Sequence, residues 1–129
     1  MMTNSLNRTL TLEINGKSRD LFMSFGLLNE LASLLGDVDR LTELPINHEL
    51  RTVILKAVLS ERTKAGKIVT EADLSEIDMD PQDVPKILAW VGEWVVDFFI
   101  QSGEAVKSVF VANMERVKSL TSSPNGTAA

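Results

Sequence analysis

Cysteine is absent from this 129-residue sequence, and histidine occurs once, as His48. Without a thiol the chain cannot form a disulfide, a thiolate zinc site or a cysteine nucleophile. With a single imidazole it cannot build a histidine-rich metal site, and a Ser-His-Asp triad would have one possible base. The motifs G-x-x-x-x-G-K-[ST], G-x-G-x-x-G and G-x-S-x-G are also missing. We therefore expect no catalytic residue, no metal and no cofactor, and we predict that the protein is not an enzyme.

Basic residues are in the minority, with 13 lysines and arginines against 18 acidic residues and a formal net charge of −5. The imbalance is greatest between Glu71 and Asp83, a segment with six acidic residues and no basic one. Such a field repels a nucleic-acid duplex, so we expect no nucleic-acid partner. The spacing of these acids does not fit the calcium-loop pattern D-x-[DN]-x-[DN]-G-x₅-E, which favours a solvated acidic segment.

Long hydrophobic runs are missing as well. The most apolar stretch, 87–100, contains Glu93 and Asp97, and it falls short of the roughly 20 apolar residues that a membrane-spanning helix needs. The residues before Arg8 are polar and lack the apolar core of a secretory signal. We therefore expect no membrane association and a cytoplasmic location.

The signals that are present predict a mainly α fold, in which a helical domain has a small N-terminal β-hairpin and a long C-terminal helix. Residues 9–14 alternate between apolar and polar side chains, which is typical of a half-buried strand. Asn15 and Gly16 follow, and this pair favours a type I′ turn because both of its positions need a positive φ. Residues 17–23 are then expected to form the returning strand.

Capping residues delimit the expected helices. These are 25–35 between Ser24 and Gly36, 48–65 between Asn47 and Gly66, and 84–120 after Asp80 or Asp83. Shorter pieces are expected at 38–43 (a turn or helix), 67–70 (extended) and 71–76 (one turn capped by Thr70).

The chain is expected to form a single helical domain over residues 1–118, followed by a flexible tail over 119–129 that is rich in Ser, Thr, Gly and Ala. An unbroken last helix would be about 55 Å long at 1.5 Å per residue. Because that exceeds the width of a globule of this size, a bend at Ser102 and Gly103 is an alternative.

The last helix carries apolar side chains on more than one stripe. Its heptad-like seam comprises Val84, Leu88, Val91, Val95, Phe98, Ser102, Ala105 and Val109. Val96, Phe99 and Ile100 lie outside that seam. Either the other helices bury all of these side chains, or part of them forms a protein–protein surface.

Two tryptophans suggest where such a surface would lie. Trp90 and Trp94 are four residues apart and therefore share a helix face, and tryptophan is enriched in interface hot spots. The alternative is an aromatic pair at the edge of the core. The candidate protein-interaction face comprises Trp90, Trp94, Val96, Phe99 and Ile100.

Glu93 and Asp97, also four residues apart, are the one arrangement that could serve acid–base chemistry. Such a site would need a pocket around both carboxylates and a second catalytic group. No glycine-rich loop or other catalytic residue in the sequence supports it, so an enzyme is the least favoured class.

Most of the chain from Leu10 to Leu120 resembles a tail assembly chaperone of bacteriophages with long, non-contractile tails. The resemblance is carried by the stretches LTLEINGKSRDLFMSFGLLNELASLLGD, LPINHELRTVILKAVLSERTKAGKI and DPQDVPKILAWVGEWVVDFFIQSG. It is a likeness along the whole chain, because this family has no catalytic signature and no fixed binding residues to transfer.

The resemblance implies a role in virion assembly inside the infected bacterial host. Members of the family are predominantly helical, self-associate, and coat the aggregation-prone tape measure protein during tail morphogenesis. A longer frameshifted form recruits tail tube protein, and family members are generally absent from the mature virion. The expected partners are therefore the tape measure protein, the tail tube protein and further copies of this chain. The competing interpretation is a structural head–tail connector or tail-completion subunit that forms a ring.

Overall fold

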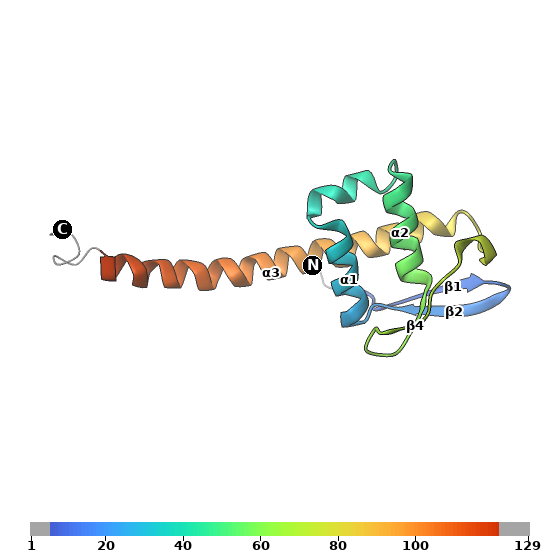
Figure 1. The fold of residues 1–129 in the computed structure, drawn as a ribbon, viewed down its shortest axis with the longest axis horizontal. Coiled ribbons are helices and arrows are strands. Elements are labelled where there is room, and N and C mark those ends of the chain that lie inside the picture. Colours follow the sequence, from blue (N-terminus) through green and yellow to red (C-terminus); the bar gives the residue numbers. More distant parts are fainter. Residues whose placement is uncertain (1–5, 122–129) are drawn as a thin grey trace. The chain divides into compact units, whose positions relative to one another are not determined.

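The computed structural model describes residues 6–121, and the chain divides into two compact units, residues 1–96 and residues 97–129. Its elements are β1 (Thr9–Ile14), β2 (Lys17–Phe22), α1 (Phe25–Leu35), η1 (Val38–Glu43), α2 (His48–Leu59), β3 (Glu61–Arg62), β4 (Ile68–Thr70), η2 (Leu74–Glu76) and α3 (Asp83–Thr121). The mainly helical composition, the N-terminal hairpin and the long C-terminal helix are as the sequence predicts (Figure 1).

The N-terminal hairpin is confirmed, and its tip is fixed by a distant loop. β1 pairs with β2 in antiparallel register, and the turn residues Asn15 and Gly16 have φ values of 55° and 78°. The backbone N–H of Asn15 donates to Asp78 O at 2.7 Å, and Asn15 Oδ1 accepts from Asp78 N at 2.7 Å. The residue that allows the turn therefore also attaches the hairpin to the loop that precedes α3.

α1 begins and ends where its capping residues predict. Ser24 Oγ accepts from Leu27 N at 3.1 Å, and Gly36 follows the last turn with φ of 76°. α2 also begins as expected, because Asn47 Oδ1 accepts from Leu50 N at 3.0 Å.

The expected C-terminal end of α2 is wrong: the helix ends at Leu59 rather than continuing to residue 65. Side chains from outside the helix satisfy its terminal carbonyls. Arg19 donates to Leu59 O at 2.8 Å, and Arg62 donates twice to Ala57 O, at 3.1 and 2.9 Å. Gly66, with φ of 110°, lies in the turn between β3 and β4 instead of ending the helix.

The segment before α3 also differs from expectation. The one-turn helix η2 begins at Leu74 and is capped by Asp73, where Thr70 and Glu71 were expected to begin it. Asp73 Oδ1 accepts from the hydroxyl of Ser75 at 2.7 Å and from its backbone N–H at 3.1 Å. These hydrogen bonds lower the pKa of the Asp73 carboxyl below its ordinary value, and the hydrogen bond from the Ser75 hydroxyl contributes most.

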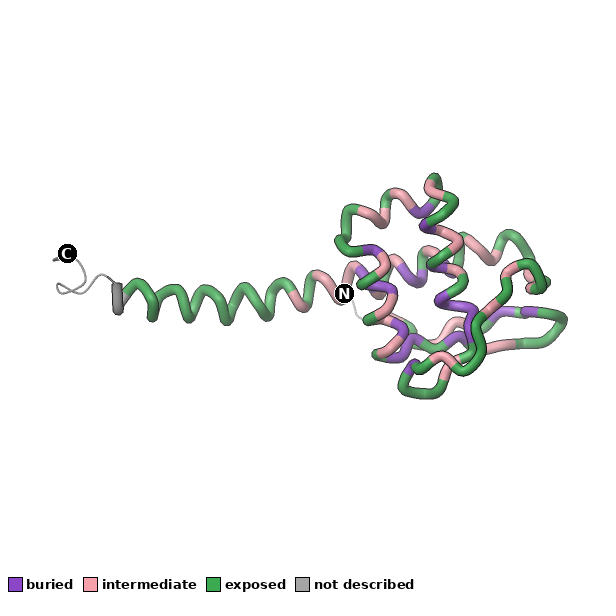
Figure 2. Tube along the Cα trace, viewed as in Figure 1, coloured by how far each residue is buried: buried purple, intermediate pink, exposed green. Residues whose placement is uncertain are grey.

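The core of the first unit is built from the hairpin, α1, α2 and the beginning of α3. α1 and α2 lie side by side (Figure 1), and the largest side chains with almost no exposure are Met23, Leu27, Leu31, Leu35, Ile54, Ile87, Val91 and Val95. Figure 2 shows the same buried positions in purple. Val91 and Val95 belong to the predicted heptad-like seam, so this part of the seam is buried within the chain itself.

α3 runs as one helix from Asp83 to Thr121 and passes through Ser102 and Gly103 without interruption. The helix continues past Ser119, where the tail was expected to begin, and the remainder of that tail, 122–129, lies outside the described residues. Among the described helices, none has the length and apolar character that a bilayer crossing would require.

Candidate functional site

The two tryptophans of the predicted face hold the N-terminal segment against α3. The indole N–H of Trp90 donates to Asn7 O at 2.7 Å, and that of Trp94 donates to the same oxygen at 2.9 Å. Trp90 is only 5% exposed, and Trp94 is half-buried. Trp90 therefore has little surface to offer a partner, and contact of either indole with another protein stays a prediction.

The remaining predicted residues lie on both sides of the division between the units. Val96 ends the first unit, whereas Phe99 and Ile100 belong to the second. Val96 and Phe99 are half-buried, and Ile100 is 53% exposed. The ring of Phe99 packs edge-to-face on that of Phe98 with a centroid separation of 5.8 Å.

In the second unit, the part of α3 after residue 97 is an amphipathic helix. At about 100° per residue, five apolar side chains fall within a sector of about 80°. We call this set the apolar ridge; its members are Phe99, Val106, Phe110, Met114 and Val117. Val106 is 67% exposed, Phe110 61% and Met114 42%. Beside them, Ser102 and Gly103 leave a shallow hollow of about 550 Å³.

The charged residues of this helix are arranged around the apolar ridge. By the same helical spacing, Lys107 lies at one edge of the ridge, whereas Arg116, Glu104 and Glu115 lie about 120° or more from its centre. The ridge is thus a largely exposed apolar stripe with one cation, Lys107, at its edge. An exposed apolar stripe on a charged helix is characteristic of a surface that binds another protein helix.

The first unit has an apolar surface of its own, a groove of about 570 Å³. We call it the apolar groove; its lining residues are Leu41, Leu44, Pro45, Arg51, Pro81, Val84, Pro85, Leu88, Ala89 and Gly92. Arg51 is the one charged residue among them, and its guanidinium donates to Pro45 O at 2.9 Å. Sequence reasoning missed this groove because its walls come from three separate segments, although the sequence does show apolar residues next to Pro45, Pro81 and Pro85.

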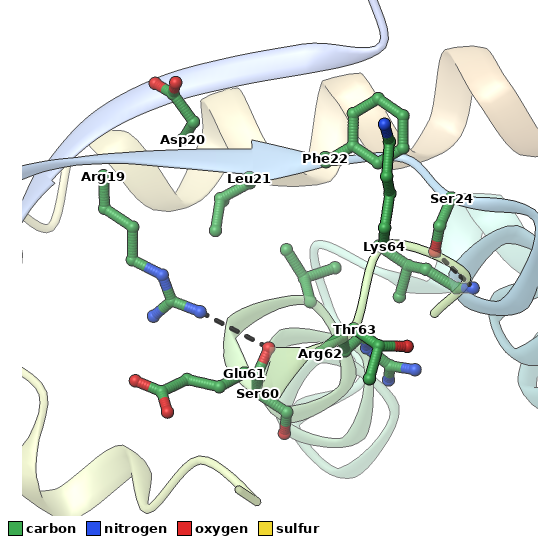
Figure 3. A pocket seen from close by; sticks show the side chains of 12 residues that line it. Arg19, Asp20, Leu21, Phe22, Ser24, Ser60, Glu61, Arg62, Thr63 and Lys64 are labelled. Atoms are coloured by element: carbon green, nitrogen blue, oxygen red, sulfur yellow. Dashed lines mark hydrogen bonds between the residues drawn. The ribbon is translucent and has the colours of Figure 1, made fainter. Parts of the chain in front are cut away.

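A second hollow, of about 330 Å³, lies between β2 and the residues that follow α2 (Figure 3). Arg19 points from β2 toward the end of α2, where it donates to Ser60 O at 3.3 Å. Arg62 donates to Gly66 O at 2.7 Å and to Glu30 Oε1 at 2.9 Å. Because these guanidinium groups already bind carbonyls and a carboxylate that hold the fold together, the hollow is a weaker candidate than the groove and the ridge.

The carboxylates considered for acid–base chemistry are separated by the division between the units. Glu93 is exposed on the first unit, and Asp97 is half-buried at the start of the second. Within residues 6–121, no three Asp, Glu or His side chains are grouped so that they could hold a metal ion. The absence of enzymatic activity stays a prediction.

Searches with the chain against protein families, curated proteins and solved structures find no match.

Proposed function

We propose that this chain is a bacteriophage tail assembly chaperone that binds and solubilises the tape measure protein and helps to recruit tail tube subunits. The observation that carries this proposal is the apolar ridge. Val106 and Phe110 are both more than 60% exposed on a helix that carries Glu104 and Glu115 away from the ridge. The resemblance of three long stretches of sequence to that family supplies the identity of the client.

The physical chemistry of the ridge suits this task. Burial of apolar surface contributes roughly 25 cal/mol per Å², so a client helix that covers the ridge gains affinity from area alone. Such binding is tolerant of sequence, because helix-on-helix packing needs apolar positions at helical spacing rather than a defined motif. The net charge of −5 keeps a protein with such a surface soluble.

The proposed role places the chain in the cytoplasm of the infected bacterium during tail morphogenesis and not in the mature virion. The tape measure protein would be the client, and the tail tube protein a later partner. A frameshifted longer form would extend the chain beyond residue 129, and residues 119–129, rich in Ser, Thr, Gly and Ala, have the composition of a flexible joint.

Co-expression with a tape measure protein tests the proposal. The wild-type chain is expected to keep the tape measure protein in the soluble fraction and to be pulled down with it. Phe110→Glu sets a charge on the ridge and is expected to abolish both effects, whereas Ser108→Glu adds the same charge on the polar face and preserves them. A tape measure protein that stays insoluble with the wild-type chain, or equal results for the two variants, would contradict the proposal.

A structural head–tail connector or tail-completion subunit is the second candidate. The presence of two different apolar surfaces on one chain favours it, because unlike surfaces that bind each other can close copies into a ring. Mass spectrometry of purified virions separates the two functions: a connector remains in the particle at a fixed copy number, and a chaperone does not.

A further inference from the structure

We propose that Asn15 is a modification site that deamidates in the folded chain, and that the backbone N–H of Asp78 promotes the reaction. Asparagine is chemically labile because the backbone nitrogen of the next residue can attack its side-chain amide. Glycine in that next position hinders the attack least, because it has no side chain. Asn15 and Gly16 meet this condition at the exposed tip of the β1–β2 hairpin. The inference does not rest on the proposed chaperone function.

The attacking nitrogen, that of Gly16, is free to react. Within residues 6–121 its N–H makes no hydrogen bond, and a Cβ built on Gly16 meets no atom within 4 Å. Hydroxide from the solvent can therefore remove its proton without breaking a contact of the fold.

The turn can adopt the conformation that the attack requires. Gly16 N must move to the side of the Asn15 Cα–C bond that carries Cβ, which happens when the peptide group between the two residues rotates. This rotation converts a type I′ turn into type II′, and both types connect hairpins and have a positive φ at the first central residue. Asn15 already has φ of 55°, and glycine accepts either sign of φ. The strands can therefore stay paired while the ring closes.

The oxygen on which negative charge develops already has a hydrogen-bond donor. Asp78 N–H donates to Asn15 Oδ1 at 2.7 Å, and Asn15 N–H donates in return to Asp78 O at 2.7 Å. When Gly16 N attacks Asn15 Cγ, the electron pair of the carbonyl bond moves onto Oδ1. A donor fixed in advance at that oxygen stabilises the oxyanion, because little reorganisation is needed as the charge forms.

The reaction proceeds through a cyclic imide. The bond from Gly16 N to Asn15 Cγ forms, the Cγ–Nδ2 bond breaks, and the proton lost from Gly16 N leaves with Nδ2 as ammonia. Water then opens the ring. Cleavage of the new bond gives aspartate, whereas cleavage of the bond to the main-chain carbonyl of Asn15 gives isoaspartate. The net reaction consumes one water, releases one ammonia and adds one negative charge beside the acidic segment 71–83.

Peptide mass spectrometry of the folded full chain, incubated at mildly alkaline pH, tests the inference. Aspartate and isoaspartate at position 15 each make the peptide about 1 Da heavier, and chromatography separates the two products. Asp78→Pro removes the N–H donor and is expected to slow the reaction at least about tenfold. Ile77, with φ of −93° and ψ of 122°, has a backbone conformation that is compatible with a following proline.

Asp78→Ala is the matched control, because it removes the carboxylate but retains the N–H, and it is expected to react like the wild type. Asn125, also followed by a glycine, is measured in the same digests and corrects for differences in incubation between samples. The wild type unfolded in guanidinium chloride is the second reference. It is expected to react at Asn15 more slowly than the folded chain, because Asp78 N–H no longer faces Oδ1.

Three results would overturn the inference. They are an unmodified Asn15 in the folded wild type, a reaction at least as fast in the unfolded chain, and a folded Asp78→Pro variant that reacts like the wild type. Circular dichroism shows whether the variants are folded. If Asp78→Pro does not fold, the comparison of folded and unfolded wild type decides alone.

Discussion

At the scale of single residues, two glycines allow α1 to approach the turn between β3 and β4. Gly26 N donates to Ala65 O at 3.1 Å. A Cβ on Gly66 would lie 2.7 Å from Gly26 Cα and 2.9 Å from Leu27 N, closer than side-chain atoms approach backbone. The contact is therefore made by backbone against backbone, and neither partner can move without displacing α1 or the turn.

Alanine substitution of Gly66 and of Gly36 separates the energetic cost of backbone strain from the cost of crowding. Gly66 and Gly36 both have positive φ, 110° and 76°, but a Cβ on Gly36 meets nothing within 4 Å. Gly36→Ala is expected to lower the free energy of unfolding by about 1 kcal/mol, from the left-handed backbone alone. Gly66→Ala is expected to cost about 3 kcal/mol or more, because the crowding adds to the strain. Urea denaturation of both variants measures the difference, and equal losses would show that the close approach carries no energy.

Arg62 shows how far a residue can depart from the role that its sequence context suggests. It is near Lys64 and Lys67 in a short basic cluster, where solvated side chains are the usual outcome. In the structure its side chain is only 8% exposed and pairs with Glu30 at 2.9 Å. The two residues are 32 positions apart, so no local pattern could have paired them.

At the scale of elements, the junction between η1 and α2 depends on one carboxylate. Glu43 Oε1 accepts from the side-chain amide of Asn47 at 3.1 Å, and its other oxygen lies 3.4 Å from Arg40 Nε. The hydrogen bond from the Asn47 amide contributes most to lowering the pKa of the Glu43 carboxyl, and the hydrogen bond from Arg40 contributes next. Since Asn47 also caps α2, Glu43 orients the residue that begins the helix.

The lowered pKa of Glu43 predicts a pH dependence with a definite sign. A carboxyl whose pKa is lower in the folded chain than in the unfolded chain stabilises the fold fully above its unfolded pKa. That contribution is lost as the pH falls through the folded value. Glu43→Gln is therefore expected to remove part of the acid-induced loss of stability, whereas Glu61→Gln, which removes an exposed carboxylate elsewhere, retains it. Unfolding free energies measured across the acidic range check this, and parallel curves for wild type and Glu43→Gln would refute it.

What could be predicted at this scale depended on where the determining contact lies in the sequence. The hairpin and the start of each of α1 and α2 followed from residues inside the element or next to it, such as Asn15, Ser24 and Asn47. The end of α2 did not, because Arg19, 40 residues away, binds its last carbonyl. The candidate face was limited in the same way, since Trp90 is held by Asn7, 83 residues away.

At the scale of the whole molecule, the chain combines a unit with a buried core and a unit with almost none. All of the described core residues with nearly complete burial lie in 1–96, and from residue 103 to residue 118 each one is exposed. A helix of about 20 residues without tertiary packing is only marginally stable in water. The second unit therefore has little tertiary packing to stabilise it, and we expect its helix to gain stability where a partner covers the apolar ridge.

Truncation after Val96 tests this division. The shortened chain is expected to unfold cooperatively with a free energy within about 1 kcal/mol of the full chain, because the removed residues contribute little to the core. Over the same range of concentration, the helicity of the full chain is expected to rise as copies associate, while that of the truncated chain stays constant. Circular dichroism at several concentrations measures both. A truncated chain that fails to fold would mean that residues after 96 stabilise the first unit.

The shared hydrogen bonds of Trp90 and Trp94 give the protein an optical reporter. These are its two tryptophans, and tyrosine is absent, so the near-ultraviolet emission of the chain comes from indoles that bind a single oxygen, Asn7 O. Detachment of the N-terminal segment would expose both indoles to water at once and shift the emission to longer wavelength. Fluorescence can therefore follow the attachment of the segment at Asn7 to α3 without any label.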